Sequence, residues 1–91
     1  MLKQKLENMT TASKLGYLQH LAGQIYLKES LSEDIREDAL TMEEVGVKHY
    51  ENMFLGKCSL KALVEFDPEK AEKEVDELII KYCDLLGEKN A

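Results

Sequence analysis

Residues 32–56 constrain the fold most, because apolar side chains recur through them at spacings of three and four. At about 100° per residue, this spacing places the side chains on one face of a single long helix. The residues of this first stripe are Ile35, Ala39, Met42, Gly46, His49, Tyr50 and Met53. We therefore expect one helix over residues 33–55, with a stripe that faces the core and with the other helices arranged around it.

Three further apolar residues of this helix recur at intervals of seven and form a second stripe. The second stripe lies roughly 100° from the centre of the first, so apolar residues cover about half of the circumference. One neighbouring helix does not cover so wide an arc, and the surplus predicts an interaction surface. With apolar residues of the N-terminal segment added, this surface comprises Leu40, Val47, Phe54, Leu2, Leu6 and Met9.

The N-terminal segment is predicted to be helical over residues 2–29, with a possible break near residue 10, where Thr10 or Thr11 can cap a new helix. Glycine is less favourable than alanine inside a helix by about 1 kcal/mol. Three glycines nevertheless fall inside predicted helices, namely Gly16, Gly23 and Gly46. We interpret them as positions where another helix backbone approaches closely; a flexible hinge is the alternative.

Two shorter segments complete the chain. Residues 60–66 are predicted to form a short helix that closes one end of the bundle. Asp67 and Pro68 predict the start of a last helix over residues 68–86, because aspartate is a favoured N-cap and proline a favoured first helical residue. The chain is thus predicted to be one all-α domain over residues 1–91. Its expected architecture is an antiparallel three- to four-helix bundle, with two long helices, one short helix and a C-terminal helix.

Acidic residues outnumber basic residues by 18 to 12, which gives the chain a formal charge of −6. This charge repels phosphate backbones and anionic membranes, so neither a nucleic acid nor a membrane is expected as a partner. The first residues lack the continuous apolar run of a signal peptide or a membrane span. Cys58 and Cys83 form no CxxC motif or paired framework, which is typical of reduced, buried cysteines. We therefore expect a cytoplasmic protein without a disulfide.

The two histidines are the side chains best suited to acid–base or ligand chemistry at neutral pH. His49 falls on the first apolar stripe without a carboxylate or histidine partner at helical spacing, so we interpret it as a half-buried core residue. A ligand or acid–base role is the alternative. His20 lies between two glycines, in a setting that resembles histidine phosphotransfer domains, but the Lys-Gly pair expected three and four residues later is replaced by Gly23-Gln24. No catalytic, cofactor-binding or metal-binding residue is therefore predicted.

Pairs of carboxylates three residues apart occur on two predicted helices. They are Asp34 with Glu37, Glu69 with Glu72, and Glu74 with Glu77. Such pairs on facing helices can hold Mg²⁺, and the pattern resembles that of small helical nucleotide pyrophosphatases. The resemblance implies a Mg²⁺-dependent nucleotide hydrolase. Glu37 and Glu77 project away from the apolar stripes, which favours a solvated charged face instead.

The leading prediction is a small acidic interaction or regulatory module without catalysis and without a cofactor. Its expected partner is a second copy of itself or another protein, bound at the surplus apolar surface. Two alternatives remain open. One is the Mg²⁺-dependent hydrolase, and the other is an acidic surface that imitates nucleic acid and occupies a basic partner.

Overall fold

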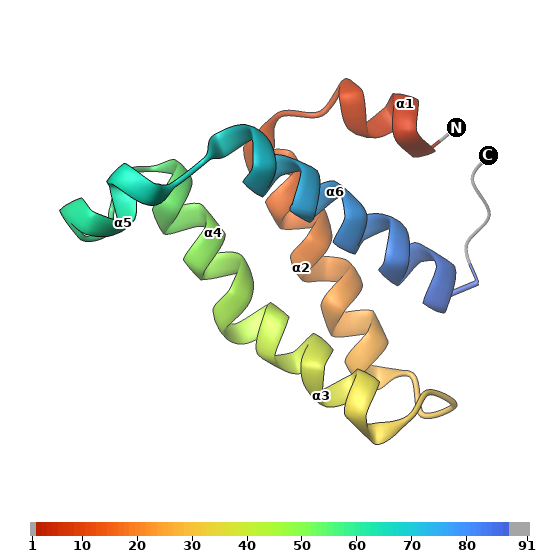
Figure 1. Ribbon diagram of the computed structural model, residues 1–91. Coiled ribbons are helices and arrows are strands. Elements are labelled where there is room, and N and C mark those ends of the chain that lie inside the picture. The colour runs from red at the N-terminus through yellow and green to blue at the C-terminus, as the bar shows by residue number, and fades with distance from the viewer. Residues whose placement is uncertain (1, 88–91) are drawn as a thin grey trace.

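The computed structural model describes residues 2–87 and is all-α, as predicted (Figure 1). Residues 1 and 88–91 of the predicted domain lie outside the described part. The elements in chain order are α1 (Leu2–Glu7), α2 (Thr11–Leu27), α3 (Glu33–Thr41), the π-helical segment η1 (Met42–Gly46), α4 (Val47–Phe54), α5 (Leu60–Glu65) and α6 (Pro68–Leu85). Together, α3, η1 and α4 form one continuous helix, which we call the central helix.

The helix on which the others pack is α2, not the central helix. One side of α2 contacts α3, η1 and α4, and another side contacts α6, whereas α4 and α6 hardly touch each other (Figure 1). The reason lies in the buried residues of α2, which span a wide arc and include Leu18, Ala22 and Ile25, all fully inaccessible. The prediction that residues 33–55 organise the fold is therefore wrong.

A π-turn changes the phase of the central helix. The backbone N–H of Val47 donates to the carbonyl of Met42, five residues earlier, instead of to the residue four earlier. One extra residue in a turn rotates everything after it by about 100° relative to an unbroken α-helix. Val47 consequently points into the core with only 4% of its surface exposed, while His49 is exposed. The interpretation of His49 as a half-buried core residue is therefore wrong.

Helix α1 returns over α2 and α6 and completes the core on that side. A break at residues 8–10 permits this return, and the Thr10 hydroxyl then caps α2 by accepting the Ser13 backbone N–H at 3.1 Å. Leu2 and Leu6 are 8% and 2% exposed and belong to the same core as the buried residues of α2 and α6. Neither leucine is therefore available to a partner, and their assignment to an interaction surface is wrong.

A buried ion-pair network joins α2 to α6. Lys14 is 5% exposed, and its Nζ lies 3.1 Å from Oε1 of Glu72 and 2.9 Å from Oδ1 of Asp76. Burial by itself lowers the pKa of Lys14, but the hydrogen bonds and negative charges of Asp76 and Glu72 outweigh that effect and raise it above its usual value. Because the lysine must face these carboxylates, the network fixes the side of α2 that α6 covers.

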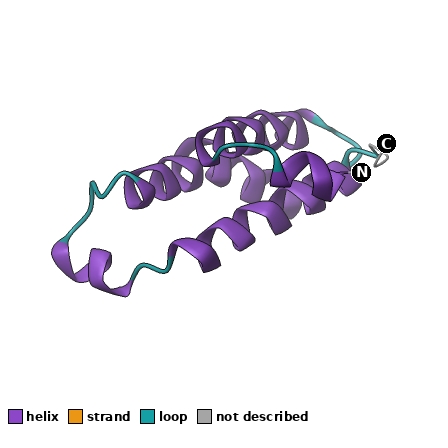
Figure 2. Ribbon diagram, turned by 90° about the horizontal axis from the view of Figure 1, so that it is seen from above, coloured by secondary structure: helices purple, strands orange, loops and turns teal. Residues whose placement is uncertain are grey.

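Helix α5 projects beyond the end of the bundle (Figures 1 and 2). The prediction that this short helix closes the end of the bundle is therefore wrong. None of its residues is buried, and Leu60 and Val64 are 77% and 79% exposed. Phe66, which follows α5, makes an edge-to-face contact with Phe54 of α4, with ring centroids 5.2 Å apart. The apolar side chains of α5 are thus left facing solvent at one end of the molecule.

Candidate functional site

Two adjoining hollows lie between α2 and the central helix, and together they form what we call the α2–α4 groove. Their volumes are about 360 and 660 Å³, and both are lined by Gly16 and Gln19. The small and apolar residues that line the groove include Ala12, Gly16 and Gly23 from α2, and Leu40, Val47 and Phe54 from the central helix. The Gln19 side-chain amide donates to the backbone carbonyl of Glu43 at 3.3 Å and links the two banks.

The α2–α4 groove lies on the side of α2 that faces away from α6. Gly16 follows Lys14 by two residues, which is about 200° around the helix axis. Since Lys14 is held against α6, Gly16 lies on the opposite side of α2. The groove is therefore not the place where α6 packs, and the described residues leave it unfilled.

The predicted interaction surface is divided between two places in the structure. Leu40, Val47 and Phe54 do come together along the α2–α4 groove, where Val47 forms the floor and the other two are half-buried. The N-terminal residues of the prediction lie elsewhere, because α1 places them in or against the core. These residues are Leu2, Leu6 and the partly buried Met9.

Among residues 2–87, the atoms nearest to the three glycines belong to side chains or are absent, not to another backbone. A Cβ atom at Gly16 would have no other atom within 4 Å, so the structure leaves open space there. At Gly23 it would lie 2.6 Å from a carboxylate oxygen of Glu43, and at Gly46 it would lie 2.5 Å from the sulfur of Met42. Both neighbours are flexible side chains, so the nearest atoms of the described residues are not backbone atoms, and close approach by a helix of another chain stays a prediction.

We expect Gly16→Ala to raise the free energy of unfolding by about 1 kcal/mol, because alanine is the better helix former and its methyl group enters open space. Gly23→Ala is the matched control and should gain less, because the Glu43 carboxylate has to move away. Urea denaturation followed by circular dichroism measures both. A loss of stability in Gly16→Ala would mean that the groove is filled at this position.

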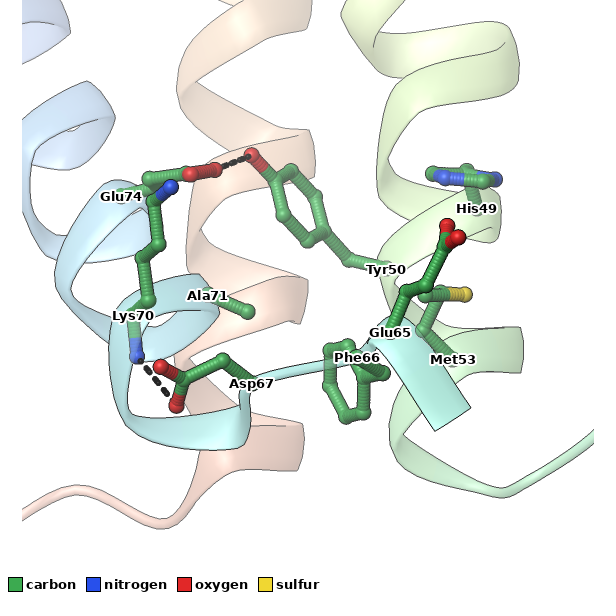
Figure 3. Close-up of a pocket in the computed structure, with 9 residues that line it drawn as sticks. All are labelled: His49, Tyr50, Met53, Glu65, Phe66, Asp67, Lys70, Ala71 and Glu74. Atoms are coloured by element: carbon green, nitrogen blue, oxygen red, sulfur yellow. Dashed lines mark hydrogen bonds between the residues drawn. The ribbon is translucent and has the colours of Figure 1, made fainter. Parts of the chain in front are cut away.

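A second depression, the α4–α6 cleft, has a volume of about 280 Å³ and is lined by His49, Tyr50, Phe66, Asp67 and Glu74, among others (Figure 3). The Tyr50 hydroxyl donates to Oε1 of Glu74 at 3.4 Å, and burial together with the Glu74 carboxylate raises the pKa of Tyr50. Asp67 caps α6 by accepting the backbone N–H groups of Glu69 and Lys70. Tyr50 and Asp67 are therefore engaged in structural contacts.

The paired carboxylates do not assemble into a metal site. Glu72 is engaged by Lys14, and Glu74 accepts the hydrogen bond of Tyr50. The remaining members Asp34, Glu37, Glu69 and Glu77 are exposed. Among residues 2–87, no three histidine, cysteine, aspartate or glutamate side chains are grouped closely enough to hold a metal ion. The described residues thus provide no assembled carboxylate site for Mg²⁺.

The remaining candidate residues do not form a chemical centre either. His20 is exposed at the edge of the α2–α4 groove. Cys83 is buried beside the Tyr17 hydroxyl, 3.4 Å from its sulfur, and Cys58 is half-buried. None of the helices within residues 2–87 is both long and apolar enough to cross a membrane.

Comparison of the chain with protein-family models, curated proteins and solved structures finds no match. The α2–α4 groove has a larger volume than the α4–α6 cleft and has the apolar Val47 at its floor. At Gly16 it also contains space that no side chain of the described residues fills.

Proposed function

We propose that the chain is a small protein–protein interaction module without catalysis of its own, and that the α2–α4 groove is its contact surface. One observation carries this proposal, namely that Val47 and Phe54 line a groove left unfilled beside Gly16. Concave apolar surfaces that the fold does not fill are typical binding sites. The acidic composition agrees with a cytoplasmic module whose partner is a protein rather than a nucleic acid or a membrane.

Apolar surface also continues from the groove toward α5. Leu55, which lines the groove, is 61% exposed. Leu63 lies beside Gly56, with its Cδ2 3.9 Å from the position of a Cβ atom there, and is 38% exposed. With Leu60 and Val64 added, the exposed leucine and valine side chains extend the contact surface beyond the end of the bundle. A partner that fills the groove can therefore cover these side chains too.

Photo-crosslinking in the cells that produce the chain tests this proposal. p-Benzoylphenylalanine at the exposed groove residue Gln24 should crosslink a partner protein, and the same group at the exposed Lys73 of α6 should not. A second change, Gly16→Trp, should abolish the Gln24 crosslink because the indole occupies the groove. Lys73→Trp is the matched control and should leave the crosslink in place.

Circular dichroism must show that both tryptophan variants keep the helical content of the wild type. Gln24 crosslinks that survive Gly16→Trp, or crosslinks formed only from position 73, would contradict the groove as the contact surface.

A further inference from the structure

The banks of the α2–α4 groove determine which kind of segment can fill it. Both banks are helices, whose backbone N–H and C=O groups are already paired along the helix, so neither offers the free edge that an extended strand needs. On the α2 bank, Ala12 and Gly16 are four residues apart and present little or no side chain, whereas the Glu43 carboxylate covers Gly23. A helix satisfies its own backbone and can lie close against such a bank.

The length of the groove sets the length of the helix that fills it. Its lining on α2 runs from Thr11 to Leu27, which is about 24 Å at 1.5 Å per residue. A helix of about 16 residues, or four to five turns, covers this distance. By contrast, α5 has only 6 residues, so the same helix from a second copy is too short to fill the groove.

The charges of the groove favour a basic occupant. Among residues 2–87, Glu43 and Glu51 are the charged side chains that line it, and no lysine or arginine does so. Lys48 lies nearby, but its pair with Glu51 is 3.9 Å long and exposed, so it is weak; Arg36 is held against Tyr26, with its Nε donating to the Tyr26 carbonyl at 2.8 Å. The chain as a whole carries a charge of −6, which disfavours a second copy and attracts a basic segment.

We propose that the occupant of the α2–α4 groove is an amphipathic, basic α-helix of another protein, which lies along α2 and the central helix as an additional helix of the bundle. This inference rests on the proposed function. The apolar face of the helix contacts Leu40, Val47 and Phe54, and its lysine or arginine side chains face Glu43 and Glu51. The partner is thus defined by its chemistry, with apolar residues at helical spacing and positive charge along their flank.

A pair of designed peptides tests this inference. Both have 18 residues with leucine at helical spacing; the remaining positions are lysine in one peptide and glutamate in the other. In fluorescence anisotropy, the lysine peptide should bind at least about tenfold more tightly than the glutamate peptide. Gly16→Trp should weaken the binding of the lysine peptide by at least about tenfold, and Lys73→Trp should not change it.

Charge reversal separates recognition in the groove from general attraction. Glu43→Lys/Glu51→Lys should reverse the preference between the two peptides. Glu65→Lys/Glu69→Lys changes the net charge equally at exposed positions outside the groove and should keep the preference. An equal loss of binding in both double variants, or no binding of the lysine peptide to the wild type, would overturn the inference.

Failure of this inference is distinguishable from failure of the proposed function. If Gly16→Trp abolishes the Gln24 crosslink but the lysine peptide does not bind the wild type, the groove is a contact surface for a different occupant. If light scattering shows a dimer that Gly16→Trp dissociates, that occupant is a second copy of the chain. Either result overturns the basic helix and leaves the groove as the contact surface.

Discussion

Replacement of Lys14 by alanine is expected to lower the free energy of unfolding by about 3 kcal/mol. The substitution leaves Asp76 without its cation, and Oδ1 of that carboxylate is buried with no other hydrogen-bond partner among the described residues. We expect a loss at the low end of the range for an unpaired buried charge, because the side chains of Asp76 and Glu72 are 32% and 39% exposed and water can partly solvate both. Urea denaturation of the wild type and of Lys14→Ala measures the difference.

A double variant distinguishes the loss of charge compensation from the loss of packing. Lys14→Met/Asp76→Leu removes both charges and fills similar space, so it should recover most of the stability lost in Lys14→Ala. A cost below about 1 kcal/mol for Lys14→Ala would contradict the network as an important link between α2 and α6.

The same network predicts a dependence of stability on pH. Because the carboxylates raise the pKa of Lys14 in the folded chain, the folded state binds this proton more tightly than the unfolded state does. The stabilisation is present in full below the ordinary lysine pKa of 10.5 and is lost as pH rises through the raised value. The wild type should therefore lose more stability than Lys14→Met/Asp76→Leu over this alkaline range.

Deletion of Val45 is expected to leave the fold intact, with a change in unfolding free energy within about 1 kcal/mol. Val45 is 60% exposed inside the π-turn, so its removal converts the turn to an ordinary α-helical one and leaves the residues on both sides in place. Val47 would keep its inward position. Thermal and urea denaturation, with circular dichroism to check helical content, measure the result.

Deletion of His20 is the matched control, because it also removes one exposed residue from within a helix. Helix α2 has no π-turn, so everything after the deletion rotates by about 100°. Leu21 and Ile25, which are 1% and 0% exposed, would leave the core, and burial of each such side chain contributes about 1.5–3 kcal/mol. The expected loss is about 4 kcal/mol. Equal losses for the two deletions would contradict the position of the register change at residues 42–46.

The π-turn also explains what periodicity could and could not predict for the central helix. The all-α class followed from spacings of three and four, and α3 begins after Ser32, a favoured N-cap residue whose hydroxyl accepts the Ile35 N–H at 3.3 Å. The π-turn, however, moves the buried position from the first apolar stripe to the second. Ala39 faces inward before the π-turn and Val47 after it. A constant angle of 100° per residue cannot reveal such a change.

The burial of Lys14, the packing of α1 and the α2 side of the groove depend on tertiary contacts, which the local sequence pattern did not indicate. The spacing of Lys14 could have indicated its burial, since it lies four and seven residues before Leu18 and Leu21 on the buried side of α2. A search for recurring apolar residues does not include lysine, so the position was not predicted. The return of α1 over the core depends on packing rather than on local spacing. The α2 bank of the groove was not predicted, because Ala12 and Gly16 contribute space rather than side chains.

An NMR titration of the ¹⁵N-labelled chain with the leucine–lysine peptide tests most directly whether the α2–α4 groove is the recognition surface. We predict the largest shifts for the backbone amides of Gly16, Gly23 and Leu40, which line the groove. The α4–α6 cleft is the internal comparison, since it also carries carboxylates. Shifts confined to Tyr50, Glu74 and their neighbours in the cleft, with the groove unchanged, would contradict the account.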